Sequence, residues 1–150
     1  MALKKGDRLP DFELQDQNDE VFKVSDLIGR HYILIYFYPK DESPGCTAEA
    51  CTFRDNFENF EDLNCKVIGI SRDRSTSHKR FAENHQLPYT LLSDPHKNVR
   101  KLFGVKDVIP GVLPGRKTYL INLEGRITHI FEYQFQPKKH VLEALLALEQ

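Results

Sequence analysis

The sequence predicts an α/β domain in which helices flank a central mixed β-sheet. Apolar, β-prone runs alternate with segments of helical periodicity, a pattern typical of strands buried between layers of helices. A hairpin pattern near the C-terminal end predicts antiparallel pairing beside the parallel pairing that such alternation produces. The 150 residues carry no internal repeat, low-complexity tract or linker, so one domain spanning residues 1–150 is expected.

The first predicted elements are short and lead into a fully apolar strand. Residues 12–16 (FELQD) and 21–24 (VFKV) predict two strands around the polar turn QNDE. Residues 24–29 (VSDLIG) predict a brief helical turn that ends at Gly29. Residues 32–38 (YILIYFY) are apolar throughout, which predicts a strand buried on both faces of the sheet.

Helices and strands alternate through the middle of the chain. Helical periodicity over residues 46–62 is followed by a second buried strand at 65–71 (CKVIGIS). A polar helix at 77–86 then precedes a short strand at 89–94 (YTLLSD). The next helix, at 96–104, is expected to stop at Gly104, since glycine is favoured just past a helix end.

The last third of the chain predicts a loop, a hairpin and a helix. Residues 108–117 (VIPGVLPGRK) are rich in proline and glycine and predict a surface loop. Residues 117–133 predict a hairpin that turns at Glu124-Gly125, and residues 137–150 a final helix with Pro137 near its first position. The apolar face of that helix is predicted to comprise Val141, Leu142, Leu145, Leu146 and Leu148. A βαβ beginning followed by a ββα ending is the plan of the thioredoxin-like fold.

Composition and charge exclude several classes of protein. Apolar residues make up 40% and charged residues 29%, which is typical of a globular protein in water. The net charge is −1 and no basic stripe stands out, so nucleic acid is not an expected partner. No apolar run approaches the roughly 20 residues of a membrane span, and the N-terminal lysines precede no apolar stretch, so neither membrane insertion nor secretion is expected.

The cysteines indicate a reducing compartment. Cys46, Cys51 and Cys65 are too few, and odd in number, for a secreted disulfide scaffold. We therefore expect a cytoplasmic protein, with a processed organelle form as the alternative, because a removed transit peptide leaves no trace. The cysteine pair has neither the Cys-x-x-Cys nor the His-x-x-x-His spacing, so no metal site is expected, and no flavin or haem site is evident.

Helix geometry separates the two cysteines that lie close in the sequence. Cys51 follows Cys46 by five residues, which is a rise of ~7.5 Å and a rotation of about 140° around a helix axis. At a helix radius of ~2.3 Å, the two Cα atoms would lie ~8.7 Å apart. A disulfide requires Cα atoms within roughly 7 Å. These residues are therefore either two unrelated cysteines or a pair that bonds only when the helix start unwinds.

Cys46 has the setting of a reactive thiol. It lies where a helix is predicted to begin, just after Pro44 and Gly45, and a helix start presents unpaired N–H groups and partial positive charge. Both stabilise a thiolate, which is the nucleophilic form of cysteine, and the same N–H groups could hold an oxyanion. Two alternatives stay open: Cys46 as a small apolar core residue, and Cys51 as an unrelated thiol on a helix flank. Cys65 opens a buried strand and is expected to be a structural thiol.

At these residues the chain resembles the peroxiredoxins, in particular the peroxiredoxin Q type, also called bacterioferritin comigratory protein. The active-site pattern of that family, Pro-x-x-x-Thr/Ser-x-x-Cys, is matched by PKDESPGC with Pro39, Ser43 and Cys46. The following CTAEAC matches the subgroup in which a resolving cysteine comes five residues later, and FRD at 53–55 matches as well. Serine at position 43 departs from the usual threonine and lacks its stiffening β-branch.

The resemblance implies roles for individual residues. Cys46 would attack a hydroperoxide, hydrogen peroxide or organic, and become a sulfenic acid, and Cys51 would resolve it as a Cys46–Cys51 disulfide. Arg116, in GRKTYLIN, matches the family's active-site arginine and would stabilise the negative charge. Ser43 would hydrogen-bond the peroxide, and Pro39 would pack over the site and exclude water.

The resemblance also bears on a neighbouring residue and on partners. Glu49 could hold Arg116 in position; the alternative is a solvated helix glutamate. The expected function is a thioredoxin-dependent peroxidase for antioxidant defence, monomeric because the chain lacks a C-terminal arm that would exchange between subunits. Two other classes stay open. A thiol–disulfide oxidoreductase would not need Ser43 or Arg116, and a redox-sensing module would use the cysteine pair to alter a binding surface.

Overall fold

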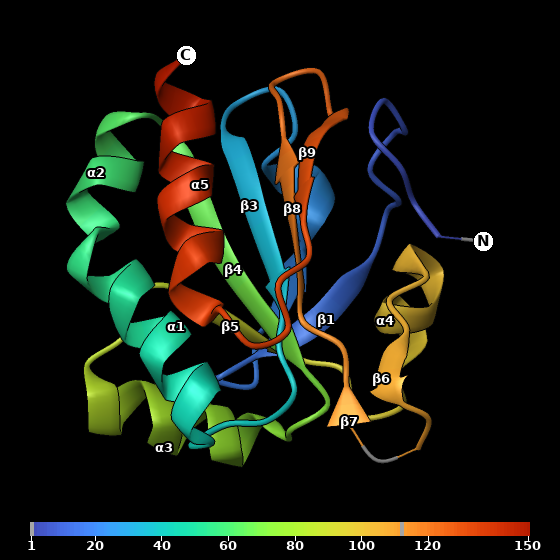
Figure 1. Ribbon diagram of the computed structural model, residues 1–150, viewed down its shortest axis with the longest axis vertical. Coiled ribbons are helices and arrows are strands. Elements are labelled where there is room, and N and C mark those ends of the chain that lie inside the picture. The colour runs from blue at the N-terminus through green and yellow to red at the C-terminus, as the bar shows by residue number, and fades with distance from the viewer. Residues whose placement is uncertain (1, 112) are drawn as a thin grey trace.

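A seven-stranded mixed sheet forms the centre of the computed structural model, which describes residues 2–111 and 113–150 (Figure 1). The strand order is β2-β1-β5-β4-β3-β8-β9. Strands β3, β4 and β5 are parallel, whereas β8 runs antiparallel to β3, β9 to β8, and β1 to both β2 and β5. The strands span β1 Glu13–Asp16, β2 Val21–Lys23, β3 Tyr32–Phe37, β4 Cys65–Ser71, β5 Thr90–Ser93, β8 Lys117–Ile121 and β9 Ile127–Phe131.

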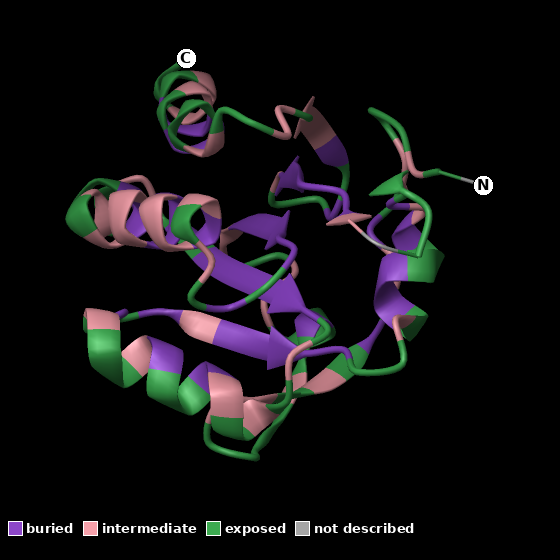
Figure 2. Cartoon of the chain, turned by 60° about the horizontal axis from the view of Figure 1, so that its bottom comes forward, coloured by how far each residue is buried: buried purple, intermediate pink, exposed green. Residues whose placement is uncertain are grey.

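Helices cover both faces of this sheet and bury its centre (Figures 1 and 2). One face packs against α1, α2, α3 and α5, and the other against α4 and the short 3₁₀ helix η1. Their bounds are η1 Val24–Asp26, α1 Pro44–Asp55, α2 Phe57–Asp62, α3 Ser75–His85, α4 Asn98–Phe103 and α5 Pro137–Glu149. The predicted α/β class, with a thioredoxin-like mixed sheet between helices, is confirmed.

The alternation of side chains along β3 explains why its sequence is apolar throughout. Leu34 and Tyr36 point into the core under α1 and α5, while Ile33, Ile35 and Phe37 point into the core under α4. All five side chains are fully buried, as a central strand between two helical layers requires. The carboxyl end of β3 leads directly into the loop before α1, so this strand fixes where α1 begins.

The helical structure predicted over residues 46–62 is confirmed, but it is divided into two helices that meet at Asn56. The Asn56 side chain donates a hydrogen bond to the Thr52 carbonyl at 2.9 Å, and its backbone N–H also donates to that carbonyl at 3.2 Å. An asparagine that bonds the preceding turn competes with helix continuation. Phe53 and Phe60 are both buried in the same core, so the apolar periodicity continues from α1 into α2 and does not reveal the break.

The predicted apolar face of the last helix is too wide. Leu142 and Leu146 are exposed, at 54% and 61%, and the buried stripe of α5 contains His140, Val141, Ala144 and Leu145. At about 100° per residue, positions three and four apart share a face, and the two exposed leucines lie beside that face. The buried stripe of α5 thus includes a histidine, which the leucine-rich sequence of the helix does not indicate.

The proline- and glycine-rich segment is only partly a surface loop. It contributes a small two-stranded sheet, β6 (Asp107–Ile109) and β7 (Leu113–Pro114), and Val112 lies outside the described residues. From Pro114 to Lys117 the chain is buried, because it enters β8 beside the central strand β3. Within the described residues, no helix combines the length and apolarity needed to cross a membrane.

Gly115 makes this buried entry possible, and its replacement is expected to destabilise the fold. A Cβ at this position would lie 2.2 Å from the Lys106 carbonyl oxygen, a backbone atom that cannot move aside alone. We expect Gly115→Ala to lower the free energy of unfolding by about 1–3 kcal/mol, the usual cost of overpacking. Denaturant unfolding measures it, and a variant as stable as the parent would contradict the close approach.

Candidate active site

Cys46 lies in the first turn of α1, immediately beyond the end of β3. Ser43 is the N-cap residue and Pro44 the first helical residue, and the first helical hydrogen bond runs from the Thr47 N–H to the Ser43 carbonyl at 2.8 Å. The earlier N–H groups of Gly45 and Cys46 therefore have no intrahelical acceptor. The Cys46 side chain is 1% exposed, so the thiol lies at the positive end of a helix and within the core.

The guanidinium of Arg116 points at the Cys46 sulfur. Arg116 Nη2 donates to Sγ at 3.3 Å, and this arginine is itself buried. Its backbone N–H donates to Gln134 Oε1 at 2.7 Å and its Nε to the Gln134 carbonyl at 3.3 Å, so the side chain is held along its length. A Cβ on Gly45 would lie 3.2 Å from Nη2, so glycine leaves room for the guanidinium. A buried cation this close favours a negative charge on sulfur.

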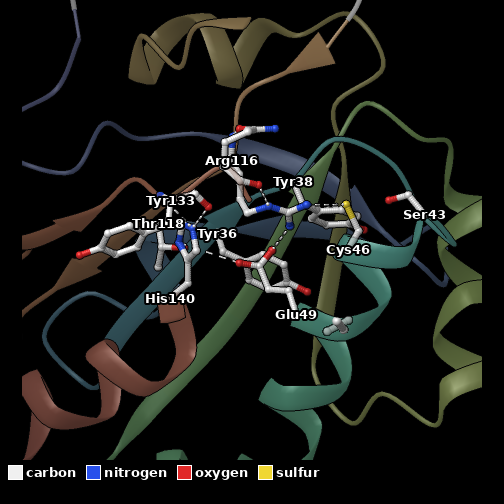
Figure 3. Close-up of polar contacts among 12 residues, drawn as sticks. Tyr36, Tyr38, Ser43, Cys46, Glu49, Arg116, Thr118, Tyr133 and His140 are labelled. Atoms are coloured by element: carbon white, nitrogen blue, oxygen red, sulfur yellow. Dashed lines mark hydrogen bonds and ion pairs between the residues drawn. The ribbon is translucent and has the colours of Figure 1, made fainter. Parts of the chain in front are cut away.

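Glu49 occupies the other side of the same guanidinium. Arg116 Nη1 donates to Glu49 Oε1 at 2.5 Å, and the carboxyl group is fully buried (Figure 3). Burial raises the pKa of Glu49 to about 8, against the opposing effect of Arg116. Arg116 thus stands between two groups that can each carry a negative charge, and burial favours the protonated form of the carboxyl.

Ser43 and Pro39 lie at the opening of the site. Together with Gly45, Arg116 and residues that include Arg72, Leu113 and Phe135, they line a hollow of about 440 Å³. The Cys46 sulfur lies between the Arg116 guanidinium and Ser43 (Figure 3). The Ser43 hydroxyl donates to the Lys40 carbonyl at 2.8 Å, so it is engaged within its own loop and offers its oxygen as an acceptor.

Cys51 lies on the same unbroken helix as Cys46. Both thiols are free, and Cys51 is half-buried. Because α1 runs continuously from Pro44 to Asp55, the helical Cα separation of ~8.7 Å applies, which is beyond disulfide reach. The structure therefore describes a reduced form whose first turn must unwind before these two sulfurs can bond. Burial raises the pKa of Cys65 to about 12, which suits a structural thiol of β4.

Two buried histidines near the site were not predicted from the sequence. His78 lies on the helix whose sequence is polar and His140 on the C-terminal helix, yet both are fully buried. His140 Nδ1 lies 2.8 Å from Thr118 Oγ1 and 3.9 Å from Glu49 Oε2. His140 lies four residues before Ala144, a spacing that places both on one face of α5. The sequence did not reveal this face, because the neighbouring leucines predict an apolar face that is shifted around the helix.

A buried carboxylate anchors the loop that precedes α1. Asp41 accepts hydrogen bonds from the Tyr38 hydroxyl at 2.6 Å, the Ser77 hydroxyl at 2.8 Å and His78 Nδ1 at 2.7 Å. Asp41, Asp73 and His78 have ligand atoms within 4.8 Å of one another, a spacing that could hold a cation. The carboxylate oxygens already accept hydrogen bonds from the protein's own donors, so this cluster is an anchor of the loop on α3.

This geometry defines a class of protein: a thioredoxin-like domain with an arginine-paired cysteine at a helix start. The model of the AhpC/TSA family matches residues 5–130 of the chain. Peroxiredoxin Q, chloroplastic, of Arabidopsis thaliana is 48% identical over 147 residues, which cover 98% of this chain and 68% of that protein. The Oryza sativa peroxiredoxin Q is 46% identical over the same length, with 67% of that protein covered.

Solved structures agree with the sequence relatives. Peroxidoxin BcpB from Mycobacterium tuberculosis superposes with a TM-score of 0.90 at 34% identity and covers 98% of this chain and 97% of that chain. A mutant of Xylella fastidiosa PrxQ superposes with a TM-score of 0.88 at 28% identity, covering 100% and 99%. The chain belongs to the AhpC/TSA family and, within it, to the peroxiredoxin Q proteins.

Ionisation of Glu49 is expected to slow the reaction of Cys46 at alkaline pH. Below about pH 8 the carboxyl is protonated and the positive charge of Arg116 faces the sulfur alone; above it, an ionised Glu49 shares that charge. We therefore expect the second-order rate constant with hydrogen peroxide to fall as pH rises through about 8, and Glu49→Gln to abolish this fall. Competition kinetics at a series of pH values on either side of that midpoint measure it.

The exposed Glu58 on α2 offers a matched control. Glu58→Gln removes a carboxylate of the same size without touching Arg116, so its pH profile should equal that of the parent. An alkaline fall that persists unchanged in Glu49→Gln would contradict the assignment of this ionisation to Glu49.

Proposed function

We propose that the protein reduces hydrogen peroxide and organic hydroperoxides with Cys46 as the attacking thiol. The observation that carries the proposal is the 3.3 Å contact between Arg116 Nη2 and the Cys46 sulfur, made beside a hollow lined by Pro39, Ser43 and Gly45. Thiol-dependent peroxidase activity fits the peroxiredoxin Q relatives. The bacterioferritin comigratory protein of Xanthomonas campestris, which superposes with a TM-score of 0.80 at 29% identity, has alkyl peroxide reduction activity.

The first step transfers one oxygen atom to sulfur. The Cys46 thiolate attacks the terminal peroxide oxygen, the O–O bond breaks, and water or an alcohol leaves after taking up one proton. Sulfur is oxidised to a sulfenic acid and the peroxide is reduced. Negative charge moves from sulfur to the leaving oxygen, and Arg116 stands where it can stabilise both. The Ser43 oxygen can accept a hydrogen bond from the peroxide, and Pro39 shields the site.

Cys51 then resolves the sulfenic acid. Its thiol attacks Cys46, an S–S bond forms, and the sulfenic oxygen leaves as water. Since the helical distance exceeds disulfide reach, the first turn of α1 must open between the two steps. Slow opening would leave the sulfenic acid available to a second peroxide molecule and to over-oxidation.

Reduction of the disulfide back to two thiols requires a thiol partner. We assign that role to thioredoxin, which exchanges its own dithiol for the Cys46–Cys51 disulfide. We further propose a monomer that acts in a reducing compartment. That compartment is the cytoplasm or, as the names of the plant relatives indicate for them, the chloroplast.

Serine substitutions separate the two cysteine roles. Cys46→Ser should abolish peroxide consumption, because the nucleophile is gone. Cys51→Ser should consume one equivalent of peroxide and stop. The sulfenic acid of Cys46 should then accumulate and be detected as a mass increase of one oxygen atom. The parent should form an intramolecular disulfide after one equivalent, which intact mass and peptide mapping detect.

Cys65 provides the matched control for these substitutions. It is buried in β4 and should be replaceable by Ala without loss of turnover with thioredoxin and its reductase. Peroxide consumption by Cys46→Ser at the parent's rate would refute the peroxidase proposal. A disulfide between Cys46 and Cys65 in the oxidised parent would refute the role given to Cys51.

A further inference from the structure

We propose that His140, on the C-terminal helix α5, is a positioning residue for the peroxidase reaction. Its Nδ1 faces the second oxygen of Glu49 at 3.9 Å and orients that carboxyl group, and the oriented Glu49 keeps the guanidinium of Arg116 aimed at Cys46. The inference rests on the proposed function, because its effect is exerted on the reaction of Cys46. Figure 3 shows the line of side chains that runs from Cys46 through Arg116 and Glu49 to His140.

The two oxygens of Glu49 have different surroundings. Oε1 accepts the 2.5 Å hydrogen bond from Arg116, whereas Oε2 is buried and has no hydrogen-bond partner among the described residues. The polar atom that faces Oε2 is His140 Nδ1, at 3.9 Å. Leaving a buried carboxyl oxygen without a partner is costly, so a polar group beside it has a large influence on how the carboxyl is oriented.

His140 is held so that Nδ1 can change its role. The Tyr133 N–H donates to Nε2 at 3.2 Å, and the Tyr133 carbonyl lies 2.9 Å from the same nitrogen. Either neutral tautomer therefore satisfies Nε2 with a backbone group. Without a proton, Nδ1 accepts a hydrogen bond from Thr118 Oγ1 at 2.8 Å and faces the protonated Glu49 carboxyl as an acceptor. With the proton, Nδ1 presents it toward an ionised Glu49, whose Oε2 is 3.9 Å away.

The groups around His140 and Glu49 differ in charge, and this difference determines how His140 can act on Glu49. Burial lowers the pKa of His140 to about 4, with a further lowering by Arg116 against the opposing effects of Tyr133 and Glu143, so the imidazole acts as a neutral dipole. Besides His140, the titratable groups near Glu49 are Arg116, Tyr36 on β3 and Tyr89 beside β5, and Cys46 lies across Arg116. Among them, only Arg116 carries a fixed positive charge. Gln134 holds its Nε and Glu49 holds its Nη1, so the orientation of Glu49 contributes to where the guanidinium points.

Two substitutions separate the nitrogens of His140. Asparagine places an amide near the position of Nδ1, and glutamine places one near Nε2. We expect His140→Gln to lower the rate constant of Cys46 with hydrogen peroxide by ~10-fold or more, about 1.4 kcal/mol, and His140→Asn to lower it less. A role confined to packing or to anchoring Tyr133 predicts the reverse order, and that order would overturn the proposal.

A double-mutant cycle with Glu49→Gln tests the connection to the carboxyl group. Since His140 is proposed to act through Glu49, His140→Gln should have little further effect once Glu49 is glutamine. The same loss in both backgrounds would overturn the proposal. His129→Gln, a half-buried histidine on β9, is the matched control and should equal the parent.

A measurement that keeps His140 in place does not depend on how the His140 variants fold. Imidazole ¹⁵N chemical shifts report which nitrogen of His140 carries the proton. We expect a tautomer change with a midpoint near pH 8 that Glu49→Gln abolishes, because an ionised Glu49 favours the Nδ1 proton. Shifts that stay constant across that midpoint would overturn the role of His140 while leaving the peroxidase intact; a parent that consumes no peroxide would instead refute the function itself.

Discussion

One buried guanidinium is shared by two groups that can become negative, and the site is built around it. Arg116 contacts the Cys46 sulfur on one side and the Glu49 carboxyl on the other. Its approach needs Gly115, which allows the chain to pass close to the Lys106 carbonyl, and Gly45, which leaves room at the helix start. With a single positive charge in a dry site, only one of the two partners can be negative at low cost. Protonation of Glu49 therefore leaves the charge of Arg116 to the sulfur.

The proposed mechanism requires the first helical turn of α1 to be ordered before oxidation and to open after it. In the reduced protein this turn places the Cys46 sulfur against Arg116. It also keeps Cys51 too far from Cys46 for a disulfide to form. The loop before it is attached to α3 twice, by Asp41 in the core and by Glu42, which accepts from Asn84 at 2.8 Å and contacts His85 at 2.7 Å on the surface. In the proposed mechanism, these contacts resist opening before oxidation and yield after it.

Local sequence patterns predicted the architecture. The pairing of side chains in the site and the burial of His140 depend on contacts between distant segments, which such patterns do not contain. The apolar run at 32–38 identified the central strand because burial on both faces leaves a signature within the segment itself. The pairing of Glu49 with Arg116 joins residues from α1 and from the entry to β8, and only family resemblance suggested it. The break at Asn56 depends on one side-chain hydrogen bond, and the burial of His140 on the packing of α5, which neighbouring leucines obscured.

Hydrogen exchange in the first turn of α1 tests most directly the claim that this turn holds the two cysteines apart. The N–H groups of residues 47–50 should be protected in the reduced protein, where α1 is intact, and should lose that protection in the oxidised protein. Protection elsewhere in the sheet should stay unchanged. Equal protection of residues 47–50 in both forms, with a Cys46–Cys51 disulfide established by mass, would contradict the account.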